Sequence, residues 1–189
     1  MKDKRYNRAK SLEVIMKRSP STMIYFSKVQ DTPIGEIWLA CSDRGLVAVK
    51  WESERPELLD YITRRLKSPA EEDSRRLAHA ANQLHEYLNG TRRQFTIQID
   101  WSLLRPFQRE ALLATFAIPY GQTSTYGNLA MQIGRPRAAR AVGRAEATNP
   151  MPLVIPCHRV LGSKGKLRGY GGGLEIKKWL LQLEGAVLA

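Results

Sequence analysis

The feature that most constrains the fold is a change in the hydrophobic pattern partway along the chain. In residues 22–51, three short apolar runs alternate with turn residues, which is typical of an antiparallel meander of strands. Apolar residues then recur at helical spacing, first after Pro56 and again over Ser74–Leu88, and residues 96–99 are typical of a further strand. The predicted strands of the meander are Met23–Phe26, Glu36–Cys41 and Leu46–Trp51. Residues 21–100 therefore predict a small α+β unit with a structural role.

The pattern after residue 100 is helical. Residues 101–105 are the predicted linker into a second unit, residues 101–189. The expected helices of this unit are 106–118, 125–133, 137–147 and 174–184. The middle two, joined by a turn at Gly134, predict a helix-turn-helix, although such helix pairs are also common in ordinary helical cores. The two units together place the chain in the α+β class.

The positive charge of the chain is concentrated in two regions. Residues 1–20 carry a net charge of +5 and residues 101–189 a net charge of +8, whereas residues 21–100 carry −1. A charge run alone is more often a solvated surface, but a strongly basic unit beside a near-neutral one favours nucleic acid as the partner. We expect residues 1–20 to form a mobile basic arm.

Several other classes of protein are disfavoured. No apolar run approaches the roughly 18 residues of a membrane-spanning helix, and the run over residues 12–16 is too short for a signal peptide, so the expected location is the cytoplasm. The two cysteines, Cys41 and Cys157, are far apart and in no metal-ligand spacing. We therefore expect a reduced protein with no metal and no cofactor.

The chemistry is predicted to lie at Pro156-Cys157-His158-Arg159-Val160. A cysteine reacts as its thiolate, so it needs a base, and a base of this kind is usually oriented by a carboxylate. Four acids follow residue 100, and they are Glu110, Glu146, Glu175 and Glu184. Glu184, in the last predicted helix, is our choice to orient His158. An isolated Cys-His pair is more often a packed cysteine beside a loop histidine, so the surrounding motifs decide between the two interpretations.

Those motifs resemble a known family. They are Tyr120-Gly121-Gln122-Thr123, Tyr126-Gly127, Pro136–Gly143, Asn149-Pro150 and Gly169-Tyr170-Gly171-Gly172-Gly173. With the cysteine motif they are similar to the O6-alkylguanine-DNA alkyltransferases, also called methylated-DNA–protein-cysteine methyltransferases. The resemblance is continuous from about Pro106 to Gly185, weak between Thr22 and Asp100, and absent from the first twenty residues. It implies an RNase H-like N-terminal domain and a winged helix-turn-helix-like C-terminal domain.

The resemblance also implies roles for individual residues. Cys157 would be the nucleophile, His158 its base through a bridging water, and Glu184 the orienting carboxylate. Asn149 would stabilise the turn before the cysteine, and Tyr126 would help to extrude the nucleotide and then protonate guanine. The substrate pocket would be walled by Val160, Tyr170 and Gly171, where family members often carry serine or alanine in place of Gly171. The expected DNA contacts are Tyr126, Arg135, Arg137, Arg140, Gly143, Arg144 and Ser163, with Arg140 filling the space of the extruded base.

These inferences predict direct-reversal DNA repair. An alkyl group would pass from O6-alkylguanine in double-stranded DNA to Cys157, once per protein molecule, because a thioether has no good leaving group. Chemistry on a base within a duplex requires base flipping, which agrees with the implied roles. We expect a monomer without membrane association, and leave O4-alkylthymine as a second substrate and cooperative binding to DNA open. The alternatives are a DNA-binding sensor that does not react and a cysteine hydrolase acting on a small acyl substrate.

Overall fold

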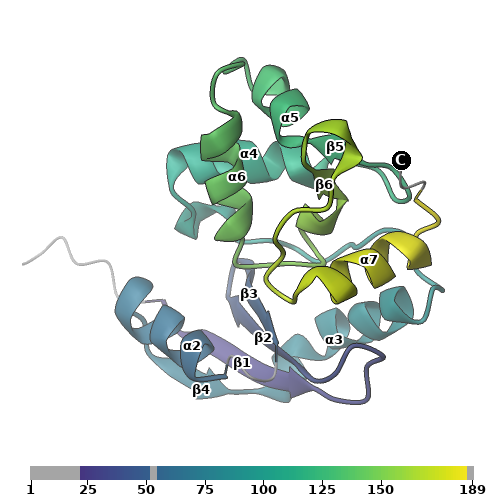
Figure 1. Cartoon of the computed structure of the whole chain (residues 1–189). Helices are drawn as coiled ribbons and strands as arrows, with labels where there is room; N and C mark the ends of the chain where they lie inside the picture. The colour runs from purple at the N-terminus through teal and green to yellow at the C-terminus, as the bar shows by residue number, and fades with distance from the viewer. Residues whose placement is uncertain (1–21, 52–54, 187–189) are drawn as a thin grey trace, which may run out of the picture.

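The computed structural model describes residues 22–51 and 55–186, so the predicted basic arm lies outside the described residues. The N-terminal half is built on the predicted meander (Figure 1). Its strands are β1 (Ile24–Val29), β2 (Ile37–Ser42) and β3 (Gly45–Trp51), and neighbouring strands pair antiparallel. A short strand that the sequence did not predict, β4 (Ala70–Glu72), pairs parallel with β1 and completes the sheet order β3-β2-β1-β4.

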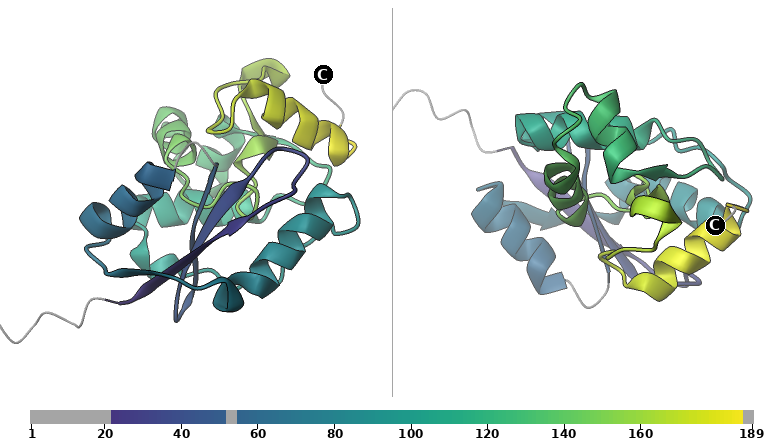
Figure 2. Two further views of the ribbon diagram at one scale, coloured as in Figure 1. Left: turned by 90° about the horizontal axis from the view of Figure 1, so that it is seen from below. Right: turned by 45° about the horizontal axis from the view of Figure 1, so that its top comes forward.

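Helices cover both faces of this sheet (Figure 2). On β2, Ile37 and Leu39 pack toward α3 (Ser74–Leu88), while Trp38 and Ala40 pack on the opposite side, with Leu58 of α2. The α2 helix, Arg55–Asp60, runs on into a π-helix over Tyr61–Arg65. Because side chains of a strand alternate between faces, a strand buried on both sides is mostly apolar, as β2 is over residues 37–41.

Residues 96–99 were predicted as a strand, and this prediction is wrong. They pair with the sheet only through a parallel bridge between Leu46 and Ile99. Gly45 has φ +136°, and a Cβ there would lie 2.5 Å from the Gln98 carbonyl oxygen, so the two backbones touch at this point. The chain then turns at once into a 3-10 helix, Trp101–Leu103, capped by the Asp100 carboxylate, which leaves no length for further pairing.

The C-terminal half contains the predicted helix-turn-helix. The helices α4 (Pro106–Phe116), α5 (Tyr126–Gln132) and α6 (Ala139–Ala147) pack around a core that includes Leu129 and Val142. Thr125 caps α5 by accepting a hydrogen bond from the Asn128 N–H at 3.1 Å.

The α6 helix begins at Ala139, two residues later than predicted. Pro136 occupies the second position of a turn that the Ala138 N–H closes onto the Arg135 carbonyl at 2.8 Å. Proline suits that turn position as well as it suits the start of a helix, and the sequence pattern does not separate the two. Arg137 therefore lies in the turn, while Arg140 and Arg144 lie on the helix.

The chain ends in α7 (Leu174–Leu183), with Glu184 at its C-cap. Its predicted buried stripe was Trp179, Leu180 and Leu183, but Leu180, Leu181 and Lys177 are the buried side chains of this helix. A two-stranded parallel sheet joins β5 (Ser124–Thr125) to β6 (Val160–Leu161), and 3-10 turns span Cys157–Arg159 and Ser163–Gly165.

One apolar core joins the two halves of the molecule. It contains Leu39 and Leu84 from the N-terminal half together with Leu112, Ile155 and Leu180 from the C-terminal half. The segment directly before Cys157 is buried in this core, which fixes the cysteine relative to both halves.

Candidate functional site

Cys157 is held by a buried loop that Asn149 organises. The Asn149 amide accepts a hydrogen bond from the Met151 N–H at 3.0 Å and donates to the Ile155 carbonyl at 3.0 Å and to the Cys157 Sγ at 3.2 Å. Within this loop Leu153 has φ +73°, an unfavourable conformation for a branched residue that the surrounding contacts maintain. The sequence predicted that Asn149 stabilises this turn, and its side chain also reaches the sulfur.

The Cys157 thiol is protonated at rest. The residue is 8% exposed, and burial, reinforced by the nearby Glu146 carboxyl, raises the pKa of its thiol to about 12. The hydrogen bond from Asn149 and the charge of Lys177 act in the opposite direction. Reaction therefore requires a base, as the sequence analysis anticipated.

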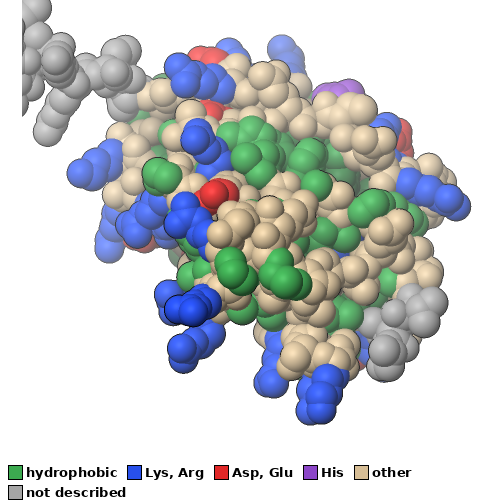
Figure 3. Space-filling model, turned by 90° about the horizontal axis from the view of Figure 1, so that it is seen from above, with side chains coloured by type: hydrophobic (Ala, Val, Ile, Leu, Met, Phe, Trp, Pro, Cys, Tyr) green, Lys and Arg blue, Asp and Glu red, His purple; other side chains and the backbone are tan. Residues whose placement is uncertain are grey.

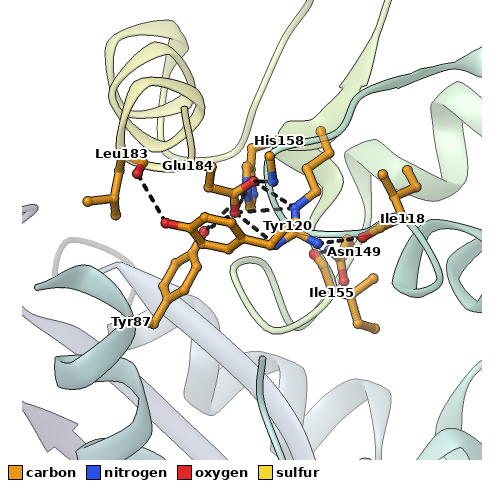
Figure 4. A network of polar contacts seen from close by, with 10 residues as sticks. Tyr87, Ile118, Tyr120, Asn149, Ile155, His158, Leu183 and Glu184 are labelled. Carbon is orange, nitrogen blue, oxygen red and sulfur yellow. Dashed lines mark hydrogen bonds and ion pairs between the residues drawn. The ribbon is translucent and has the colours of Figure 1, made fainter. Parts of the chain in front are cut away.

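The structure brings His158 and Glu184 together in a buried network (Figure 4). His158 Nε2 lies 3.0 Å from Glu184 Oε1, and Arg159 binds the same carboxylate through Nη2 at 2.8 Å and Nε at 2.9 Å. The Tyr87 hydroxyl donates to Oε1 at 2.6 Å, and the Gly121 N–H donates to Oε2 at 3.2 Å.

The charges in this network identify the basic nitrogen. Burial would raise the pKa of Glu184, but hydrogen bonds from His158 and Arg159 outweigh burial and lower it to about 2. Burial lowers the pKa of His158 although Glu184 opposes it, so the ring is neutral at pH 7. An ionised carboxylate only accepts hydrogen bonds, so Nε2 carries the ring proton. Nδ1 is then the free base, and it has no hydrogen-bond partner among the described residues.

Three residues of this centre were missed by the sequence analysis. Arg159 stands inside the cysteine motif, and its charge next to the histidine predicted as the base was a usable signal. Lys177 was another, since it interrupts an apolar stripe; its Nζ is buried and donates to the Val160 carbonyl at 2.7 Å. Tyr87 belongs to α3, in the half expected to be purely structural, and nothing local in the sequence marks it.

A cavity of about 330 Å³ opens onto the cysteine. Its lining includes Tyr170 and Gly171, which were expected as walls of the substrate pocket, and Tyr126 and Gly143, which were expected among the DNA contacts. The remaining lining residues are Glu146, Ala147, Cys157 and Gly169. Val160, expected as a wall, is fully buried in the core that packs against Tyr126 and does not line the cavity. A larger cavity, of about 520 Å³, is lined by Tyr120 and Arg159 but not by Cys157.

Basic side chains surround the face formed by the helix-turn-helix (Figure 3). The side chains of Arg137, Arg140 and Arg144 are exposed, as is Ser163 in its 3-10 turn. Arg135 is exposed too, but it forms an ion pair with Glu110 at 3.1 Å. A Cβ at Gly143 would lie 3.8 Å from the Tyr126 ring, so the bare backbone of α6 adjoins that tyrosine.

Two further observations describe the chain as a whole. Among the residues that the structure covers, no cluster of three or more His, Cys, Asp or Glu side chains is arranged to hold a metal ion. None of the described helices combines the length and apolarity that crossing a membrane requires.

Comparison with known proteins gives consistent results. Two family descriptions match: "6-O-methylguanine DNA methyltransferase, ribonuclease-like domain" over residues 24–101, and "6-O-methylguanine DNA methyltransferase, DNA binding domain" over residues 106–186. A methylated-DNA–protein-cysteine methyltransferase of Salmonella typhimurium is 41% identical over 160 residues, which cover 83% of this chain and 94% of the relative. One from Mycolicibacterium paratuberculosis is 44% identical over 156 residues, 82% and 88% of the two chains.

Solved structures agree with these matches. The crystal structure of Mycobacterium tuberculosis O6-methylguanine methyltransferase superposes with a TM-score of 0.71 at 36% identity, covering 86% of this chain and 93% of that one. A structure of the Mycobacterium tuberculosis protein in complex with DNA gives a TM-score of 0.69 at the same identity, with 86% and 92% coverage.

Proposed function

The chain belongs to the methylated-DNA–protein-cysteine methyltransferase family, and on this premise we propose that Cys157 accepts an alkyl group from damaged DNA. The protein repairs DNA by direct reversal, with alkyl transfer to its own cysteine. The observation that carries the assignment to Cys157 is that this residue lines a cavity together with Tyr126 and Tyr170. The other cysteine, Cys41, is the last residue but one of strand β2 and lines none of the cavities described above.

The base in the reaction is His158. Its Nδ1 takes the thiol proton through a bridging water, and the imidazolium that forms is stabilised by the ionised Glu184 carboxylate 3.0 Å from Nε2. Arg159 and Tyr87 fix the carboxylate in place, so the ring keeps one orientation. This arrangement supports the role of Glu184 as the orienting group.

Transfer is a balanced displacement. The thiolate attacks the alkyl carbon, the S–C bond forms as the C–O6 bond breaks, and the electron pair leaves with the base, which takes up one proton to become guanine. The Asn149 N–H, 3.2 Å from Sγ, stabilises the negative charge of the thiolate before it attacks. Tyr126 supplies a proton to the base, and the proton that His158 took from the thiol replaces it, so no net charge remains. Burial raises the pKa of the Tyr126 hydroxyl, so it stays protonated until the transfer. The thioether product has no leaving group, so each protein molecule reacts once.

DNA binds along α6. Arg137 and Arg144 contact phosphates, and Arg140 fills the gap that the flipped nucleotide leaves. The small residues of this helix, with Gly143 beside Tyr126, let the backbone approach a groove closely. Arg135 and Ser163 add contacts at the flanks, and Arg135 exchanges its ion pair with Glu110 for a phosphate.

The substrate is O6-alkylguanine in duplex DNA, flipped into the cavity beside Tyr170 and Gly171. Because Gly171 has no side chain, its contact to the base comes from the backbone. The protein acts as a monomer in the cytoplasm. Residues 101–105 mark the boundary between the structural domain, 21–100, and the DNA-binding and transfer domain, 101–189.

The test is a single-turnover reaction with equimolar duplex carrying one O6-methylguanine, followed by intact mass measurement and peptide mapping. We expect one added methyl group on the peptide that contains Cys157, with guanine restored in the DNA. Cys41→Ser should react normally, whereas Cys157→Ala should bind the lesion without reacting. Tight lesion binding by the wild type without any mass gain would instead identify a sensor. Repeated turnover of activated esters without DNA would identify a hydrolase.

A further inference from the structure

A second carboxyl group faces the reaction cavity. Glu146 lies in α6, is 7% exposed and lines the same cavity as Cys157. Its Oε1 accepts a hydrogen bond from the Thr115 hydroxyl at 2.6 Å. Its Oε2 is buried and has no hydrogen-bond partner among the described residues. Buried polar atoms are nearly always paired, so an unpaired carboxyl oxygen beside a nucleophile calls for a functional explanation.

Polar and charged groups of α4, α5, α7 and the cysteine turn interact with Glu146. Thr115 of α4 donates a hydrogen bond to Glu146. The charge of Glu146 raises the pKa of Tyr126 of α5 and of Cys157, and the positive charge of Lys177 of α7 lowers the pKa of Glu146. Burial raises the pKa of Glu146 to about 7, although Thr115 and Lys177 favour the charged form. Tyr170 also lines the cavity, and burial raises the pKa of its hydroxyl well above the ordinary value, so it adds no charge at neutral pH.

Two acids, Glu146 and Cys157, therefore line the cavity, and one buried cation acts on both of them. Lys177 is fully buried, and its Nζ interacts electrostatically with both Glu146 and Cys157. Two negative charges in one buried site repel each other, and a single cation neutralises only one of them. An ionised Glu146 thus raises the free energy of the thiolate on which transfer depends.

We propose that Glu146 is a second acid of the transfer cavity and must hold its own proton while Cys157 gives up its proton. The inference rests on the proposed role of Cys157 as the alkyl acceptor. The rate of transfer should rise with pH below about 7 and rise less steeply above it, because Glu146 ionises there and opposes formation of the thiolate. Glu146 would in this way determine the pH above which the rate of repair gains less from each further rise in pH.

The test compares wild type, Glu146→Gln and the control Glu175→Gln, which changes an exposed acid at the start of α7. Two rates are measured from pH 6 to pH 9 on the full chain: alkyl transfer from saturating lesion duplex, and alkylation of Cys157 by iodoacetamide without DNA. In both assays we expect Glu146→Gln to match the wild type at pH 6 and to exceed it by about tenfold at pH 8–9, the ratio for two acids that interact by about one pKa unit. Glu175→Gln should follow the wild type throughout.

The inference would be overturned if the ratio of the Glu146→Gln rate to the wild-type rate stayed constant with pH in the iodoacetamide assay. It would also be overturned if Glu146→Gln were slower than the wild type at every pH. Thr115→Val provides a second variant, because it removes the hydrogen bond that favours the charged carboxyl without changing the cavity lining. Its rates should depart from the wild type in the same direction as those of Glu146→Gln, and a departure in the opposite direction would contradict the inference. If the iodoacetamide ratios rise as expected but no protein takes an alkyl group from DNA, then the coupling stands and the proposed function fails.

Discussion

The sharpest test of the buried network is the substitution Glu184→Gln. The carboxylate accepts hydrogen bonds from Tyr87, His158, Arg159 and Gly121 and is 6% exposed. Glutamine keeps the shape but removes the charge and replaces one acceptor oxygen with an N–H donor. The Arg159 guanidinium, itself 7% exposed, would then be a buried cation without a counter-ion, facing a second donor group.

The expected cost is large because one partner of a buried ion pair is lost while the other stays. Such changes destabilise proteins by about 3–5 kcal/mol. For a chain of 189 residues, each kcal/mol lowers the melting temperature by about 2–4 °C, so Glu184→Gln should lower it by roughly 6–20 °C. Urea titration at pH 7 measures the free energy of unfolding directly, and its slope should stay unchanged. Glu175→Gln, on the exposed face of the same helix, should change stability by no more than about 0.5 kcal/mol.

A double variant, Glu184→Gln with Arg159→Met, removes both members of the buried ion pair. Replacing both members of a buried pair by uncharged groups is often close to neutral, so the second substitution should recover part of the lost stability. Alkyl transfer should not recover, because His158 still lacks the carboxylate that stabilises its protonated form, and we expect a loss of about 100-fold or more. A loss of under 1 kcal/mol in Glu184→Gln, or no recovery in the double variant, would refute the reasoning.

Three further outcomes follow from the structure. The pKa of Glu184 is lowered from 4.5 to about 2, so its ionisation contributes about 3 kcal/mol to the free energy of unfolding. This contribution is complete above pH 4.5 and is lost as the pH falls toward 2. Urea titrations at pH 7, 4 and 3 should show the loss in the wild type and not in Glu184→Gln. A Cβ at Gly172 would lie 2.7 Å from the Trp51 ring, whereas one at Gly171 would lie 3.7 Å from it, so Gly172→Ala should lower the free energy of unfolding by about 1–3 kcal/mol and Gly171→Ala by less than about 0.5 kcal/mol. Arg137→Ala should weaken binding to damaged and undamaged duplex alike and reduce the slope of log affinity against log salt by about one, as measured by fluorescence anisotropy.

Local sequence patterns were sufficient to predict those elements whose formation depends on residues adjacent in the sequence. The bounds predicted for α3, Ser74–Leu88, agree with the structure because the helix has an apolar stripe, an Asp73 cap and a Gly90 stop in sequence. Strand β4 was missed because Ala70–Glu72 has no alternating apolar pattern and is a strand only through its pairing with β1. Its formation is decided by a partner more than forty residues earlier in the chain.

The same distinction applies to the site. Cys157 and His158 were predicted from a local motif, Glu184 was chosen among four acids in the second half of the chain, and the resemblance implied the same residue. Tyr87 could not be found in this way, because its hydroxyl meets Glu184 only after α3 and α7 pack together. Glu146 was among the four acids considered, but its position inside the cavity depends on how α6 packs beside the cysteine loop.

The contribution of Tyr87 changes the interpretation of the N-terminal half. That half also donates the Val49 N–H to the Pro150 carbonyl at 2.8 Å, and so it anchors both the loop that carries Cys157 and the Glu184 carboxylate beside His158. A thiol with a pKa near 12 reacts only if base, amide and substrate are held together, because little thiolate exists otherwise. For a protein that uses its nucleophile once, this is an advantage, since the cysteine is not consumed by electrophiles that fail to fit the cavity. In the proposed reaction, the N-terminal half that looks purely structural in the sequence therefore helps to hold a poorly reactive thiol in the geometry that transfer requires.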